Sequence, residues 1–149
     1  MRTSEDGFTL VELAVVSLVL GILVAIALPN FLGFQKTASE LRTRADLTNV
    51  AKAQVAIAVS EGAFTTDEGS LGYMVPGIEF GDATDSSIRV VVGDIDPGDS
   101  RQVLLYARAV TGDWFGLRLV GIGVDAGRQT CRSPNEADMT LAFCNGTDW

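Results

Sequence analysis

The hydrophobic and polar positions divide the chain into two unlike parts. Residues 8–35 contain a single ionisable side chain, Glu12, whereas nearly all the remaining charge lies beyond Lys36. Within this stretch residues 13–28, LAVVSLVLGILVAIAL, are apolar on every side of a helix. About 20 residues at about 1.5 Å each cross the ~30 Å hydrocarbon core of a bilayer. The pattern therefore predicts a membrane-spanning helix close to the N-terminus.

From Asn30 onward the apolar positions recur at three- and four-residue steps, which predicts that the helix continues in amphipathic form as far as Gly62. These positions are Phe31, Phe34, Ala38, Leu41, Ala45, Leu47, Val50, Ala51, Val55, Ala58 and Val59. A helix over residues 8–61 would be about 81 Å long at about 1.5 Å per residue. Its outer half must therefore protrude from a membrane and be covered along one face.

Pro29 interrupts this long helix. Its nitrogen carries no hydrogen to donate, and its ring clashes with the turn that precedes it. Gly21 adds a second weak point on the N-terminal side. We therefore expect the helix to kink or to melt locally between Gly21 and Pro29.

The remainder of the chain is patterned as a sheet. Three segments rich in β-branched and aromatic residues predict strands: Ile88–Val92, Gln102–Val110 and Trp114–Val124. Short turns between them favour an antiparallel meander of about three strands. Residues 62–87 contain many glycines and little periodicity, which predicts a long connecting loop. The expected fold class is α+β, a long helix packed on a small antiparallel sheet.

Composition argues against an enzyme. The chain contains no histidine, which removes every catalytic arrangement built on an imidazole and every histidine-ligated metal or haem. No phosphate-binding loop is present, and no cofactor is expected. The formal net charge of −8 gives no general attraction to nucleic acid or to anionic lipid.

The two cysteines, Cys131 and Cys144, lie close together beyond a membrane-length segment. An even number of cysteines in that position predicts one disulfide in an oxidising compartment, and the alternative is a pair of reduced, buried thiols. Closing a ring of about 15 residues stabilises a fold by about 3 kcal/mol in the chain-entropy description. Such a bond would hold the last loop, residues 132–143, against the sheet.

Three interpretations of the apolar segment compete. A secretory signal peptide would use Ala25-Ile26-Ala27 as its cleavage site, but residues 1–7 hold one arginine and two acidic residues where a basic start is usual. A simple single-pass anchor explains the length but not Glu12, whose charge is costly in lipid unless it is paired. Glu12 could also lie at the interface and reach the headgroups. An assembly segment that supplies a partner for Glu12 is the third interpretation.

The residues Gly7-Phe8-Thr9-Leu10-Val11-Glu12, the apolar stretch and Pro29 resemble the leader and first helix of type IV pilins and pseudopilins. The resemblance covers about residues 1–60. It implies that a prepilin peptidase removes the leader, residues 1–7, by cutting between Gly7 and Phe8, and that Phe8 is then N-methylated. The acidic leader departs from the basic leaders usual in the family.

The same resemblance implies an organisation and a role for the mature chain. Residues 8–29 would form the membrane-spanning and filament-core helix, residues 30–61 the amphipathic helix, residues 62–87 the connecting region and residues 88–149 the sheet. Glu12 would pair with the amine of Phe8 in a neighbouring subunit, which supplies the cation that a buried carboxylate needs. The chain would wait in the cytoplasmic membrane as a precursor and then polymerise into an extracellular filament. An assembly ATPase and a platform protein would drive that step.

The resemblance leaves alternatives within the family. A structural subunit (major pilin) of a type IV pilus-like filament is the expected function, with motility and adhesion as its usual uses. A C-terminal disulfide such as Cys131–Cys144 is typical of pilins, whereas many pseudopilins of type II secretion lack it. The alternatives are therefore a secretion pseudopilin, or a minor pilin that acts in adhesion or DNA uptake.

Two weaker signals lie in the sheet region. Asp94, Asp96 and Asp99 offer carboxylates to a calcium ion, but their spacing departs from the known calcium loop and favours a solvated turn. Five arginines and three aromatic residues offer a patch for single-stranded DNA, although acidic residues outnumber them and favour ordinary surface pairing. These residues are Arg101, Arg108, Arg118, Arg128, Arg132, Tyr106, Trp114 and Trp149.

Overall fold

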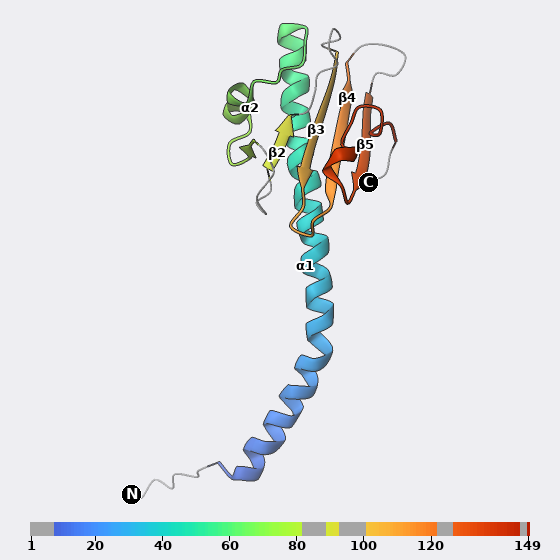
Figure 1. The fold of residues 1–149 in the computed structure, drawn as a ribbon. Coiled ribbons are helices and arrows are strands. Elements are labelled where there is room, and N and C mark those ends of the chain that lie inside the picture. The colour runs from blue at the N-terminus through green and yellow to red at the C-terminus, as the bar shows by residue number, and fades with distance from the viewer. Residues whose placement is uncertain (1–7, 82–88, 93–100, 122–126, 147–148) are drawn as a thin grey trace, which may run out of the picture. The chain divides into compact units, whose positions relative to one another are not determined.

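The structure, a computed structural model, describes residues 8–81, 89–92, 101–121, 127–146 and 149. It divides into two compact units, residues 1–37 and 38–149, each of which is described by itself below. Figure 1 shows the elements in order: α1 (Leu10–Glu61), α2 (Glu68–Met74), β1 (Glu79–Phe80), β2 (Arg89–Val92), β3 (Gln102–Arg108), β4 (Trp114–Val120), β5 (Gly127–Ser133) and the 3₁₀ helix η1 (Glu136–Asp138). The expected α+β fold class is confirmed.

The first unit consists of the N-terminal part of α1, and all of its described residues are exposed. Its apolar part has a mean hydropathy of 2.8 and is, by length and composition, able to cross a membrane. The helix passes through Pro29 without a break, so the expected local melting between Gly21 and Pro29 is wrong. Pro29 removes only one backbone donor from the helix, and α1 stays helical on both sides of it. The kink at Pro29 stays a prediction.

In the second unit α1 presents one buried face to the sheet. The buried residues are Thr43, Leu47, Val50, Ala51, Ala53, Gln54 and Ile57. They include part of the predicted stripe, but Leu41, Val55 and Val59 remain exposed by 56%, 47% and 83%. The helix is therefore covered along one face, as expected, but this face includes only some of the apolar positions. Val55 and Val59 lie on a second apolar face that the sheet does not reach.

The sheet has five strands in the order β1-β2-β3-β4-β5. The three predicted strands pair antiparallel in succession, as expected, and β5 adds a fourth antiparallel strand beside β4. The two-residue strand β1 pairs parallel with β2. One face of the central strands packs against α1 and forms the main core. The strand residues of this core are Val90, Val103, Leu105, Ala107, Phe115, Leu117 and Leu119.

Residues 62–87 are not the plain loop that the sequence predicted, because they contain α2 and β1. Asp67 begins α2 by accepting hydrogen bonds from the amides of Gly69 and Ser70. The fully buried Gln54 fixes the approach from α1: its amide nitrogen donates to the carbonyl of Thr65 at 2.6 Å, and its oxygen accepts from the Thr65 amide at 3.0 Å. The side chain thus satisfies both backbone groups of one turn residue.

The predicted disulfide between Cys131 and Cys144 is confirmed, and both cysteines are fully buried. The bond holds the C-terminal loop on the face of the sheet that points away from α1. A second small core forms there around Leu104, Trp114 and Met139. Coverage on both faces explains why β3 and β4 lack the clean alternation of a half-exposed sheet.

Gly116 on β4 lies opposite Cys131 and leaves the space that the disulfide occupies. A Cβ at this position would lie 2.5 Å from Cys131 Sγ and 2.7 Å from Cys144 Sγ. Neither sulfur can move freely, because the bond ties each to the other. We expect Gly116→Ala to lower the free energy of unfolding by about 1–3 kcal/mol through overpacking. Denaturant unfolding of the full chain in detergent measures this loss.

Gly33→Ala is the control, since a Cβ at Gly33 meets no atom within 4 Å. This variant should unfold at or above the denaturant concentration of the wild type, because alanine favours a helix over glycine. Equal stability of Gly116→Ala and the wild type would contradict the packing described here.

Candidate assembly segment

The start of α1 is closed by a reciprocal set of hydrogen bonds. The Thr9 amide donates to Glu12 Oε2 at 2.9 Å, and the Thr9 hydroxyl donates to the same oxygen at 2.8 Å. In return the Glu12 amide donates to Thr9 Oγ1 at 3.2 Å. This is the capping box of a Ser/Thr-x-x-Glu sequence, in which two amide donors at the helix start are satisfied at once.

The capping box changes the interpretation of Glu12. From the sequence, the Glu12 carboxylate was expected to find its partner in a neighbouring subunit, but the single chain already gives Oε2 two donors. Within the described residues, no donor to Oε1 is found. Glu12 Oε2 therefore holds the helix start together. The Thr-x-x-Glu spacing of residues 9–12 is the sequence signal for this capping box.

Phe8 directly precedes the cap, and its side chain is 82% exposed. The Phe8–Thr9 peptide supplies the amide that Glu12 accepts, so the Phe8 nitrogen lies one residue away from the carboxylate. Gly7, on the other side of the expected cleavage, lies outside the described residues. The expected processing residues and the assembly residue are thus neighbours at one end of an exposed apolar helix.

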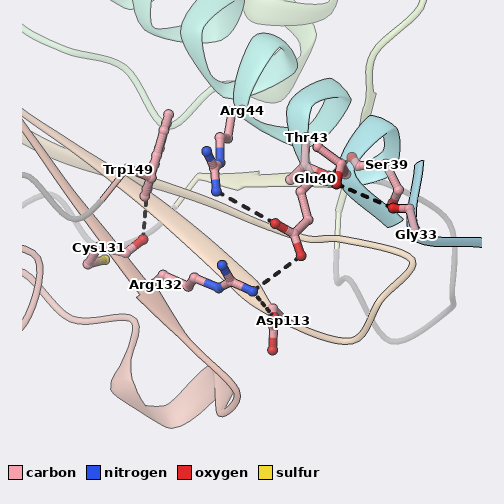
Figure 2. A network of polar contacts seen from close by, with 10 residues as sticks. Gly33, Ser39, Glu40, Thr43, Arg44, Asp113, Cys131, Arg132 and Trp149 are labelled. Atoms are coloured by element: carbon pink, nitrogen blue, oxygen red, sulfur yellow. Dashed lines mark hydrogen bonds and ion pairs between the residues drawn. The ribbon is translucent and has the colours of Figure 1, made fainter. Parts of the chain in front are cut away.

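The second unit has its own charged cluster, which fastens α1 to the sheet (Figure 2). Glu40 on α1 lies 3.2 Å from the Arg132 guanidinium on β5 and 3.6 Å from that of Arg44. Arg132 also pairs with Asp113, and this hydrogen bond raises the pKa of Arg132 above its ordinary value. Two carboxylates thus share one arginine and join α1, the β3–β4 turn and β5.

The C-terminal residue Trp149 is part of the same attachment. Its indole nitrogen donates to the carbonyl of Cys131 at 2.8 Å and to that of Gly116 at 3.2 Å. Its ring meets Phe115 edge-on at 6.1 Å between centroids, and the Arg44 guanidinium lies 4.9 Å from the centre of the Phe115 ring. These contacts tie Trp149 to β4 and β5, and Figure 2 shows the hydrogen bond from its indole to the Cys131 carbonyl.

The arginines considered for nucleic acid are largely engaged within the chain. Arg108 lies over Trp114, Arg128 over Trp149 and Arg132 over Phe115. Arg118 donates to the side chains of Gln102 and Gln129 on the neighbouring strands. Such contacts fit the ordinary surface pairing that the sequence favoured, and we propose no nucleic-acid site.

The weak calcium candidates Asp94, Asp96 and Asp99 lie outside the described residues, so the structure does not test them. In the part of the chain that the structure does describe, no group of acidic residues and cysteines is arranged to hold a metal ion.

Comparison with known proteins finds one family motif and two relatives, each covering less than half of this chain. Residues 2–28 match a family described as the prokaryotic N-terminal methylation motif. The type IV major pilin protein PilA of Myxococcus xanthus is 33% identical over 67 residues, which cover 45% of this chain and 30% of that protein. The type IV wide pilus major component PilA4 of Thermus thermophilus is 32% identical over 71 residues, which cover 48% of this chain and 53% of that protein.

The alignments thus span about a third of the first relative and about half of the second. The motif match covers residues 2–28, and so includes the expected cleavage site and the capping box.

The capping box predicts that the Thr9 hydroxyl protects the start of α1. Thr9→Val keeps the shape of the side chain but removes the acceptor of the Glu12 amide and one donor to the Glu12 carboxylate. We expect the Glu12 amide to exchange its hydrogen several-fold faster in the full chain in detergent micelles, measured by NMR.

Ser17→Ala is the matched control, because Ser17 Oγ donates to the Leu13 carbonyl within the helix and satisfies no group at its start. Exchange at Glu12 should be unchanged in this variant. Unchanged exchange in Thr9→Val as well would show that the box does not hold the helix start.

Proposed function

We propose that this chain belongs to the type IV pilin family and is a structural subunit (major pilin) of a type IV pilus-like filament. The observation that carries the proposal is the apolar helix start within the methylation motif, exposed throughout residues 8–37 and holding one carboxylate, Glu12. Both relatives are named as major components of type IV pili. Their names and the Cys131–Cys144 bond favour a pilus over a secretion pseudopilus.

The precursor would be held in the cytoplasmic membrane by α1, whose length and composition suit a bilayer. Prepilin peptidase would cut between Gly7 and Phe8 and methylate the new amine. Cleavage removes the acidic leader and creates a positive charge one residue from the capping box. The mature subunit would then leave the membrane and enter a filament on the cell surface.

Polymerisation would bury the apolar surface of each helix against the helices of its neighbours. Burial of apolar side chains is favourable but has no direction, so it does not fix how far one helix slides along another. The pair between Glu12 of one subunit and the Phe8 amine of the next would fix this axial register. Capping already orients Glu12, so little side-chain entropy is lost when the pair forms.

Other proteins would supply the energy for this process. An assembly ATPase acting through a platform protein is the proposed driver, since the sequence has no phosphate-binding loop. We assign the chain no catalytic role and no cofactor. Motility and adhesion are the proposed uses of the filament.

Material sheared from the surface of the producing cell tests the function directly. We expect an intact mass and N-terminal sequence that begin at N-methylated Phe8, and a mass lower by two hydrogen atoms than that of the fully reduced chain. Cleavage, export and the disulfide would then be established together. A chain that begins at Met1 or after Ala27, or absence from the sheared fraction, would overturn the proposal.

Glu12→Gln separates processing from assembly. The amide keeps the size of the side chain but leaves the Phe8 amine of a neighbour without an anion, which is costly inside an apolar core. We expect cleaved, methylated chains to accumulate in the membrane while sheared filaments fall by more than about tenfold. Glu136→Gln, a change at an exposed residue of η1 in the second unit, should leave the filament yield unchanged. Normal yield from Glu12→Gln would remove Glu12 from the proposed register.

A further inference from the structure

The second unit carries an open apolar groove that its own described residues do not fill. It has a volume of about 660 Å³ and runs between α1 and the adjoining ends of β3, β4 and β5. Val55 and Val59 of α1 form much of one wall, and Leu119 of β4 contributes to the other. This is the second apolar face of α1, with Val59 exposed by 83%. A groove of this size is large enough to receive side chains from a partner.

The charged residues among those described that line the groove are basic: Lys52, Arg128 and Arg101. Arg101 is already engaged in an interaction of its own, so Lys52 and Arg128 are the cations considered for an occupant. Arg128 is steadied by its position over the Trp149 ring, 5.4 Å from the ring centre. An occupant with an apolar part and an acidic border would therefore match the groove in both respects.

A surface of that kind lies on α2. Tyr73 is 91% exposed and Met74 43% exposed. Asp67 and Glu68 stand at the start of the same helix and are exposed. Hydrogen bonds from the Ser70 hydroxyl and from the Ser70 and Gly69 amides lower the pKa of Asp67, so it remains an anion near neutral pH.

The two surfaces lie on opposite sides of one unit. In Figure 1 α2 stands beyond the β2 side of the sheet, whereas β4 and β5, which border the groove, lie on the other side of α1. A chain therefore cannot place its own α2 in its own groove. Two different complementary surfaces on opposite sides make a head-to-tail contact, which extends into a filament instead of closing into a pair.

We propose that α2 of one subunit docks in the groove of the next copy of this chain, with Tyr73 between Val55 and Val59 and with Glu68 facing Lys52. This contact rests on the proposed function, because it requires the subunits to be arrayed in a filament. It assigns the exposed apolar residues of the second unit to a lateral interface between neighbouring heads.

Cross-linking in assembled filaments tests the contact. Filaments of a Val59→Cys, Tyr73→Cys double variant are treated with a short bismaleimide and separated on a reducing denaturing gel. Each subunit would then be linked to two neighbours, so we expect a ladder of dimers, trimers and larger species. Each single variant should remain almost entirely monomeric. Pairing Tyr73→Cys with Val110→Cys is the matched control. Val110 is 64% exposed but does not line the groove: it follows the end of β3, whereas Arg101 of the groove precedes its start.

Charge reversal provides a second test that does not depend on introduced cysteines. Lys52→Glu and Glu68→Lys should each lower the yield of sheared filaments several-fold, because each places like charges together. The double variant should recover most of the wild-type yield. Lys52→Glu combined with Glu136→Lys should not recover it, since Glu136 lies in η1 and not on α2.

The outcomes separate this contact from the proposed function. Wild-type cells without filaments would overturn the function and the contact together. Filaments that form normally but give no ladder would overturn the contact alone. If the cysteine variants do not assemble, the charge-reversal pair decides, and failure of the double variant to recover would also overturn the contact.

Discussion

The structure depends on one constraint: a long apolar surface that the chain does not cover for itself. Every described residue of the first unit is exposed, and Glu12 is its one ionisable side chain before Lys36. Water cannot solvate such a surface without a large free-energy cost. The segment must therefore lie in lipid or against other copies, and the fold only has to keep it helical. The capping box at Thr9 and Glu12 does so at the end where the first amides have no partner within the helix.

The same helix meets a different requirement after Ala38, where it becomes the support of a folded head. In this part of the helix, polar side chains make defined contacts with the rest of the unit, as the apolar side chains do. Gln54 binds both backbone groups of Thr65, and Glu40 reaches Arg132 on the last strand. Leu47 and Val50 provide the packing between these two contacts. Apolar burial holds the sheet on the helix, and the polar contacts determine where along the helix it sits.

The sequence predicted the parts of the fold that rest on strong local patterns. The apolar run, the amphipathic continuation, three strands and the disulfide all leave such patterns. The sequence did not predict the elements whose structure depends on tertiary contacts, β5 and α2. β5 has little apolar character because it pairs with β4 at the edge, and α2 contains two glycines that weaken its helical signal but begins at a capping aspartate, Asp67. In the assembly segment, Glu12 was found through its charge in an apolar run, whereas its partner Thr9 was missed.

The proposed filament subunit would need two kinds of contact, which the chain would separate along α1. The apolar N-terminal part could bury surface at almost any rotation or axial offset, so in the proposed filament its specificity would rest on the charge of Glu12. The second unit leaves a few large apolar side chains uncovered, among them Tyr73 on α2 and Val59 in the groove. These two residues lie on opposite sides of that unit (Figure 1). Because the two surfaces differ, each subunit that docks through one of them leaves its other surface free for the next subunit. With the proposed contact, polymerisation along one direction would follow from the shape of a single subunit.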